Sequence, residues 1–496
     1  MDLPSASRRL FMKRNLVNSI FKYSSVDAKG VVFVHGTKRL AQFARDLSYS
    51  DLSPQVIEIG KMCVEDLIGV ALAGSVTPHG RIWRSYFACD GQPAEASAWE
   101  QGFPRMAYRQ AAALNAAYGH LLDMDDVHNS SIVHLGIITI PAALAIGSHR
   151  HCSGRELLAA IAAGYEVGAR VGEAINPSSY YYWHTTGVVG ALSTAAAAGK
   201  LLGLNEEQYL NAFGSAGTQS AGLWEFLADG AMSKALHTVN ATLCGIRSAE
   251  LAALGVTGAQ DILTGKRGLL RALAPDYDQE ALTRELDYGR LKLLGNSFKP
   301  YACCRHTHSA NYAVEKIKLR HELRPENISH ITDKTYAVAR QTVDCPDPTT
   351  PYACKFSAQY CIAAMLLYGN LMEEVFTEPN VSNPWIRQLM EKITVEQDAQ
   401  LEAEHQADTN SWPHLLEITL HSGEVITEKV CYPLGDARNP FDWAMTDRKF
   451  NTLTDGILTI EQAESLCGAI QHLEELDDVS LLFEPKLSLV SGGPPY

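Results

Sequence analysis

The feature that most constrains this chain is a series of helical patterns that are apolar almost all round and rich in Ala and Gly. Residues 154–175, 186–203 and 232–255 carry apolar side chains at spacings of three and four. Helices that are apolar on every side must be buried against one another, and small side chains let their axes approach closely. The sequence therefore predicts a mostly α fold, with a large all-helical domain over residues 37–293.

A second pattern begins after residue 294, where prolines cluster and shorter alternating runs appear. Residues 328–339 alternate as a β-strand does, and residues 415–430 are typical of a β-hairpin with its turn at Ser422 and Gly423. We therefore expect a smaller α+β domain over residues 294–435. Residues 436–496 return to a helical pattern, and we expect these C-terminal helices to rejoin the helical domain.

Charge and cysteine usage limit the possible partners. The 496 residues carry a formal net charge of -14, which opposes a nucleic-acid role because phosphate contacts need a surplus of Lys and Arg. An anionic substrate therefore needs a local positive pocket. The 11 cysteines form no CxxC pair, which favours free thiols in a reducing compartment. No apolar run is long enough for a membrane span.

Residues 1–36 are predicted to be a basic N-terminal extension, with Ser and apolar residues between the Lys and Arg side chains. Such a segment is either a transit peptide or a simple basic tail. A cytoplasmic and a mitochondrial location therefore both stay open.

The first cluster with chemical potential is acidic. Asp123, Asp125 and Asp126 end a strongly apolar helical pattern, and His134 follows them. Three carboxylates in four residues repel one another unless they are exposed, paired or partly protonated. The cluster marks a plain helix end, a metal site or an acid/base site. The apolar run at residues 137–147 favours a lined cleft.

A second candidate is His184, which directly precedes an Ala-rich helical pattern. The positive end of the helix dipole favours its neutral form, as a base or acceptor. A core histidine with a satisfied hydrogen bond is the alternative.

Cationic side chains form two further clusters. Lys234 and His237 are three residues apart and share one helical face. Residues 299–311 contain no acid, and their basic side chains indicate either a carboxylate-binding wall or an ordinary basic surface. They are Lys299, Arg305, His306 and His308. A metal is not predicted, because Cys303 and Cys304 are adjacent and no CxxC is present to complete an iron–sulfur cluster.

Five segments, in this order, resemble the MmgE/PrpD family. They are residues 123–134, 182–190, 221–237, 299–308 and 356–369. The resemblance runs from about residue 37 to the C-terminus. It implies a large helical domain built from both chain ends, a smaller α+β lid domain, a homodimer, and a cleft between the domains that works without metal or organic cofactor.

The resemblance also implies site residues. The family's active-site positions correspond to Asp123, His134, His184, Lys234, Lys299 and Tyr360, with His237 and His308 close by. We expect His134, oriented by Asp123, to transfer a proton at carbon, and His184 or Tyr360 to assist the departing hydroxyl. Arg305 and His306 add donors for carboxylates. One departure is Val127, which stands where decarboxylases of the mammalian type have Thr.

The expected function is that of a cofactor-independent lyase which dehydrates a 2-methylcitrate-like or alkylcitrate-like tricarboxylic acid. The carbanion formed next to a carboxylate needs fixed cations. Decarboxylation of cis-aconitate to itaconate, and epimerisation or isomerisation of a related dicarboxylate, need nearly the same groups and stay open. An inactive dimeric helical scaffold is the alternative outside the enzyme class.

Overall fold

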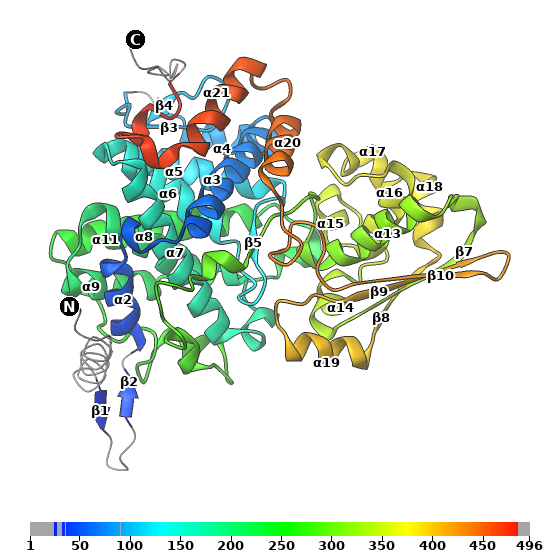
Figure 1. Cartoon of the computed structure of the whole chain (residues 1–496), viewed down its shortest axis with the longest axis horizontal. Coiled ribbons are helices and arrows are strands. Elements are labelled where there is room, and N and C mark those ends of the chain that lie inside the picture. The colour runs from blue at the N-terminus through cyan, green and yellow to red at the C-terminus, as the bar shows by residue number, and fades with distance from the viewer. Residues whose placement is uncertain (1–23, 27–31, 35, 90, 485–496) are drawn as a thin grey trace, which may run out of the picture.

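The computed structural model describes residues 24–26, 32–34, 36–89 and 91–484. A larger helical part and a smaller α+β part lie side by side, and the C-terminal helices lie on the helical part (Figure 1). The predicted mostly α fold is therefore confirmed. The extension predicted for residues 1–36 falls almost wholly outside the described residues, and its two interpretations stay predictions.

The helical part contains long helices and a few short ones. Its helices are α2 (Gly36–Asp46), α3 (Pro54–Ser75), α4 (Pro78–Phe87), α5 (Tyr108–Leu121), α6 (Leu135–Arg150), α7 (Gly154–Ile175), α8 (Thr185–Leu202), α9 (Glu206–Gly217), α10 (Phe226–Asp229), α11 (Lys234–Ala253), α12 (Leu269–Leu273), α20 (Trp443–Thr454) and α21 (Ile460–Gln471). Two short strands also belong to it, β3 (Ala96–Ser97) and β4 (Arg105–Met106). A third short pair, β1 (Ser24–Val26) and β2 (Val32–Val34), precedes α2.

The centre of the helical part is α8, which packs against α6, α7, α9 and α11. Its alanines 195–198 are fully buried, as expected for a helix that is apolar on all sides. Small residues set the close approach, since a Cβ added at Gly190 would lie 2.7 Å from Cβ of Ala241 on α11. The predicted burial of these helices against one another is confirmed.

The α+β part is a four-stranded sheet with strand order β10-β9-β7-β8, in which only the β7–β8 pair is parallel. Helices α13 and α16 pack against it. The elements are α13 (His308–Arg320), β7 (Ile328–Thr335), α14 (Ala337–Val343), α15 (Pro351–Cys354), α16 (Ala358–Tyr368), α17 (Glu378–Val381), α18 (Pro384–Met390), β8 (Ile393–Gln397), α19 (Ala399–Ala407), β9 (His414–Leu420) and β10 (Val425–Val430).

The strand predictions are confirmed with one correction. Strands β9 and β10 form the predicted hairpin, with Ser422 and Gly423 in its turn. The strand predicted over residues 328–339 ends at Thr335, and α14 follows it. Thr335 is the last residue of β7 that pairs with β8 and with β9, so the strand ends where its partners stop pairing with it.

Two further observations concern the whole described chain. All eleven cysteines are free thiols. Among the described residues, none of the helices combines the length and apolarity that crossing a bilayer requires.

The C-terminal helices α20 and α21 pack on α3 (Figure 1). Glu65 of α3 is fully buried in this joint, and neither of its carboxylate oxygens has a hydrogen-bond donor. Burial, together with the nearby carboxylate of Asp447, raises the pKa of Glu65 from 4.5 to about 9. Glu65 is therefore protonated at neutral pH.

Glu65→Gln tests this assignment. The unfolded chain releases the Glu65 proton near pH 4.5 and the folded chain only near pH 9, so the stability that this group contributes is lost as pH rises between these values. Gln has no proton to lose. Urea unfolding should therefore give a higher free energy of unfolding for Glu65→Gln than for wild type near pH 9, and a much smaller difference near pH 5. An equal difference at both pH values would contradict the raised pKa.

Candidate active site

The acidic cluster occupies the connection between α5 and strand β5 (Val127–His128), where the two parts of the fold meet (Figure 1). Strand β5 pairs antiparallel with β6 (Asn296–Ser297). In this register the residues that precede β5 lie beside those that follow β6. The sheet pairing therefore brings Lys299 to the acidic loop, although 176 residues separate it from Asp123.

Asp123 is paired with two lysines. Its carboxylate contacts Nζ of Lys234, at the start of α11, and lies 3.2 Å from Nζ of Lys299. All three side chains are almost completely buried. Burial favours the neutral carboxyl, but the two ammonium groups outweigh it and hold the pKa of Asp123 far below its usual range. Asp123 is therefore a fixed negative charge that neutralises the lysines.

The carboxylate that contacts His134 is Asp125, so the prediction that Asp123 orients His134 is wrong. Nδ1 of His134 lies 3.1 Å from Oδ2 of Asp125, in a contact whose geometry is not that of a hydrogen bond. Nδ1 of His120 lies 2.9 Å from the same oxygen. Despite burial, the two imidazoles hold the pKa of Asp125 well below its usual range, and burial lowers the pKa of His120 to about 4. Neutral His120 therefore donates its Nδ1–H to Asp125.

Asp126 anchors the loop. It accepts hydrogen bonds from the backbone N–H of Gly136 (3.0 Å), the hydroxyl of Tyr165 (2.6 Å) and Nδ2 of Asn296 (2.6 Å). Burial raises the pKa of Asp126 to about 7. Its three donors come from α6, α7 and β6, so Asp126 fixes the loop to two helices of the helical part and to the strand that pairs with β5.

His184 precedes the first residue of α8, as the sequence predicted, and pairs with His237 of α11 through their Nδ1 atoms at 3.0 Å. Burial holds the pKa of His184 well below its usual value and, together with Lys234, lowers that of His237 to about 4. Both rings are therefore neutral, and Nε2 of His184 is left without a partner.

A small cavity of about 20 Å³ lies against these groups, with room for about one water molecule. Its lining includes predicted site residues from both parts of the fold together with four aromatic side chains. The lining residues are Asp123, Val127, Ile132, His134, Tyr180, His184, Trp224, Lys234, Cys304, Arg305, His306, Phe356 and Trp412.

Buried nitrogen atoms without partners belong to the side chains around this cavity. They are Nε2 of His184, Nε1 of Trp224, Nε of Arg305 and Nε2 of His306. Trp224 and Arg305 can only donate, whereas the Nε2 atom of each histidine donates in one tautomer and accepts in the other. The contact of Nδ1 of His306 with the hydroxyl of Tyr336 (2.6 Å) fits either tautomer. Buried polar groups are nearly always satisfied in folded proteins, so four unpartnered nitrogens around one cavity indicate a site for a polar ligand.

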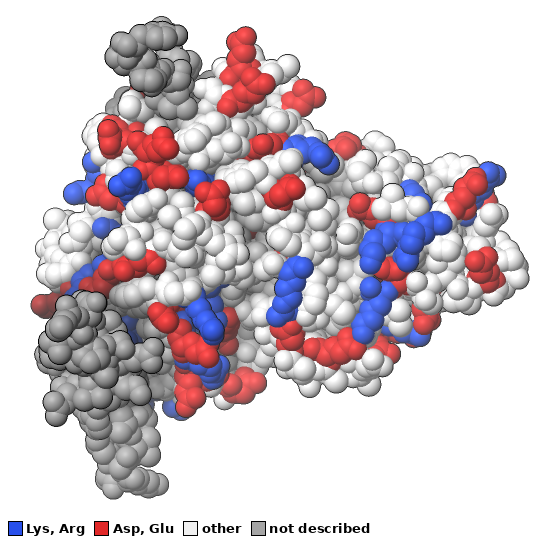
Figure 2. Space-filling view, in the orientation of Figure 1, with Lys and Arg blue, Asp and Glu red and all other residues white. Residues whose placement is uncertain are grey.

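The basic run at residues 299–311 is buried, so its interpretation as an ordinary basic surface is wrong. Lys299 and Arg305 are 0% and 4% exposed. Arg305 lies 3.3 Å from Asp436, and Nδ1 of His308 lies 3.4 Å from Arg305. On the face shown in Figure 2, surface Lys and Arg side chains are interspersed with Asp and Glu. The cations of this run therefore lie in the interior of the protein, paired or hydrogen-bonded there.

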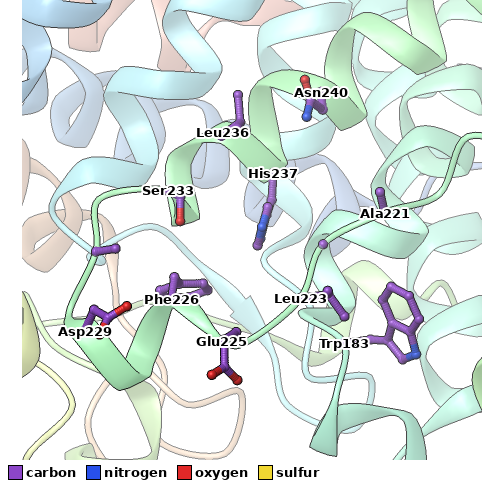
Figure 3. A pocket seen from close by; sticks show the side chains of 12 residues that line it. Trp183, Ala221, Leu223, Glu225, Phe226, Asp229, Ser233, Leu236, His237 and Asn240 are labelled. Atoms are coloured by element: carbon purple, nitrogen blue, oxygen red, sulfur yellow. The ribbon is translucent and has the colours of Figure 1, made fainter.

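Some predicted residues are not part of the cavity lining. Tyr360 is fully buried on α16 and donates its hydroxyl to the carbonyl of Val375 at 2.8 Å. Lys299 and His308 lie behind the lining. His237 lines a neighbouring open cavity of about 580 Å³, where it projects from α11 towards the segment that carries Phe226 (Figure 3). The structure thus separates Tyr360 from the other predicted site residues.

Sequence reasoning missed several residues of the site. His120, Asp125, Trp224 and Trp412 were not proposed, although Asp125 belongs to the acidic cluster. One available signal was His120 in the last turn of an apolar helix, directly before three carboxylates. Trp412 gave no signal, because its contact with His306, a ring stack at 4.2 Å, joins positions more than a hundred residues apart.

One group of residues in the site has the spacing of metal ligands. His120, Asp125 and His134 offer ligand atoms that lie within 4.8 Å of one another. Two imidazoles and a carboxylate suit Zn²⁺. The absence of a metal therefore stays a prediction.

Comparison with known proteins gives two family models that together span most of the chain. The MmgE/PrpD N-terminal domain matches residues 38–281, and the MmgE/PrpD C-terminal domain matches residues 301–475. A cis-aconitate decarboxylase of Homo sapiens is 27% identical over 90% of this chain and 93% of its own. A cis-aconitate decarboxylase-like protein of Aspergillus oryzae is 26% identical over 92% and 97%. A mitochondrial 2-methylcitrate dehydratase of Yarrowia lipolytica is 28% identical over 50% and 49%.

The pairing of Asp123 predicts a large stability effect. Asp123→Asn leaves two buried ammonium groups uncompensated and should lower the free energy of unfolding by about 3–5 kcal/mol. The control is Asp278→Asn, which breaks an ion pair with Arg284 on the surface and should cost at most about 1 kcal/mol. Urea unfolding at neutral pH measures both. Similar losses for the two variants would show that the lysines do not depend on Asp123.

Proposed function

The chain belongs to the MmgE/PrpD family, and from this premise we propose that it is a cofactor-independent lyase acting on a tricarboxylic acid. The observation that carries the proposal is the set of four unpartnered buried nitrogens around the small cavity, beside the ammonium group of Lys234. Carboxylates are acceptors only, and each has about four sites for donors. A tricarboxylate can accept hydrogen bonds from all the donors of this set at once.

The proposed reaction is dehydration of a 2-methylcitrate-like or alkylcitrate-like substrate. His134, held by Asp125, removes a proton from the carbon next to a carboxylate. Lys234 and Arg305 stabilise the negative charge that develops on this carboxylate. The electron pair then forms the carbon–carbon double bond and expels the hydroxyl from the neighbouring carbon. The hydroxyl takes up a proton and leaves as water.

His184 is the proposed partner of the departing hydroxyl, since its Nε2 is free and buried at the cavity. Tyr360, the alternative named from the sequence, has its hydroxyl committed to Val375 and lies outside the cavity lining. We therefore leave Tyr360 out of the proposed mechanism. Since the cavity has room for about one water molecule, lining side chains have to move to admit a substrate.

Decarboxylation of cis-aconitate is the second candidate. The observation in its favour is coverage, because the cis-aconitate decarboxylase of Homo sapiens aligns over 90% of this chain and the dehydratase of Yarrowia lipolytica over only 50%. In this reaction a carbon–carbon bond breaks, carbon dioxide leaves, and His134 protonates the carbanion that remains. Val127 speaks against it, because Val offers no hydroxyl at the position where decarboxylases of the mammalian type have Thr.

A panel assay tests the proposal and separates the two reactions. Purified protein, dialysed against a strong chelator, is incubated with 2-methylcitrate, citrate and cis-aconitate while alkene formation and carbon dioxide release are both followed. Alkene formation without carbon dioxide release from 2-methylcitrate supports dehydration, and carbon dioxide release from cis-aconitate supports the second candidate. Activity that returns only with added Zn²⁺ would assign His120, Asp125 and His134 to a metal. No turnover, together with no shift of the melting temperature by citrate, would support the inactive scaffold.

His134→Ala should lower the rate of whichever reaction the panel assay detects by about 100-fold or more. This is the usual effect of removing a positioned acid or base. The control is His330→Ala, because His330 is an exposed histidine on β7. Both variants should keep the wild-type melting temperature to within a few degrees. A folded His134→Ala variant with full activity would remove His134 from the mechanism.

We also propose that the protein is a homodimer that associates through the segments around the open cavity. Large apolar side chains are exposed on these segments. They are Tyr181, Tyr182, Leu223, Met232 and Leu236. Sedimentation should give a dimer for wild type and a monomer for Tyr182→Glu, while Tyr86→Glu, which alters an exposed side chain on α4, should remain dimeric. A monomeric wild type would exclude the proposal.

A further inference from the structure

Three lysines donate to three consecutive backbone carbonyls of the acidic loop. Nζ of Lys355 lies 2.8 Å from the carbonyl oxygen of Leu122, and Nζ of Lys449 lies 2.9 Å from that of Met124. Between them, Nζ of Lys299 contacts the carbonyl of Asp123. Every carbonyl in this stretch of the loop therefore accepts a hydrogen bond from an ammonium group.

The three lysines come from different places in the fold. Lys355 directly follows α15, Lys299 follows β6, and Lys449 lies on α20, one of the C-terminal helices. Each is at most 7% exposed. Successive carbonyls of a loop point in different directions, so lysines from separate elements are needed to reach all three. The loop is held from the α+β part and from the C-terminal helices at once.

Each lysine also has a carboxylate that balances its charge. Lys355 pairs with Glu373, Lys449 lies 2.6 Å from Asp66, and Lys299 pairs with Asp123 itself. Burying an ammonium group costs free energy of folding unless the group is paired and hydrogen-bonded. The carboxylates beside Lys355 and Lys449 are Glu373 and Asp66. Lys234 and His134 pair with other carboxylates, those of Asp123 and Asp125. The hydrogen bonds from these two lysines to the loop are thus separate from the substrate-facing charges.

The loop backbone at this point is unusual and determines two contacts of the site. Asp123 has φ +54°, a left-handed conformation that is uncommon for residues other than glycine. Its carboxylate meets Lys234, and two residues later Asp125 meets His134. A change in the path of the backbone between Leu122 and Met124 displaces both carboxylates together.

We propose that Lys355 and Lys449 are positioning residues that hold residues 122–124 in the path at which Asp123 reaches Lys234 and Asp125 reaches His134. The packing of the α+β part and of α20 against the loop is thereby coupled to the geometry of the site. The part of this inference that concerns catalysis rests on the proposed lyase function, whereas the part that concerns the loop does not.

The test compares Lys355→Met and Lys449→Met with a matched control. Lys61→Met also removes a buried lysine that donates to a backbone carbonyl, that of Gln471, and pairs with carboxylates, but it does not touch the loop. Hydrogen exchange read by mass spectrometry on peptides that contain residues 120–126 measures the loop without any substrate. We expect exchange at least about 10-fold faster in the two loop variants and wild-type exchange in Lys61→Met.

Turnover of the substrate found in the panel assay gives the second readout. kcat should fall by about 10- to 100-fold in Lys355→Met and Lys449→Met, because small displacements of catalytic groups are costly, and should stay near wild type in Lys61→Met. Lys355→Arg, which keeps a buried cation, should recover part of kcat. If a Met variant does not fold, the corresponding Gln variant replaces it.

Wild-type loop exchange in both loop variants would overturn the proposal. So would faster loop exchange with kcat equal to that of Lys61→Met, since the lysines would then hold the loop without affecting catalysis. If the wild type turns over no tricarboxylate, the proposed function fails, and the exchange measurements alone decide whether the lysines hold the loop.

Discussion

The buried carboxylates of the acidic loop are the constraint on which the rest of the site depends. Three of them within four residues cannot stay ionised together in a protein interior unless each has its own partners. Asp123 has two lysines, and Asp125 has two histidines. Asp126 has uncharged donors only, and burial raises its pKa to about 7. The same sequence motif thus yields two fixed negative charges and one carboxyl that titrates near neutrality.

These partners come from most of the fold, so the site exists only when the whole chain is assembled. Lys234 begins α11, Lys299 follows β6, and His134 and His184 precede α6 and α8. The close packing of α8 against its neighbours, which the small residues allow, sets the positions of these helix starts. Unpartnered N–H groups of Trp224 and Arg305, free histidine Nε2 atoms and the ammonium group of Lys234 then surround one cavity. A polycarboxylate supplies acceptors for such groups.

The helices and the hairpin were predictable because their signals are local. Apolar spacing of three and four within residues 186–203 determines a helix and also, since every side is apolar, its burial. The alternation and turn residues of residues 415–430 determine a hairpin in the same way. The extension of the first strand beyond Thr335 was wrong because the end of a strand depends on where its partners stop pairing, and those partners lie more than fifty residues away.

The sequence by itself determined which residue types meet in this protein: clustered carboxylates, helix-start histidines and a basic run without acids. It also determined that the chain is mostly helical. The tertiary structure decided which of these groups contact one another. It placed His134 beside Asp125 instead of Asp123, and it buried the basic run. It also directed the hydroxyl of Tyr360 to the carbonyl of Val375. The physical reason is that backbone periodicity is set by near neighbours, whereas ion pairs and cavities are set by which elements pack together, over separations such as the 176 residues between Asp123 and Lys299.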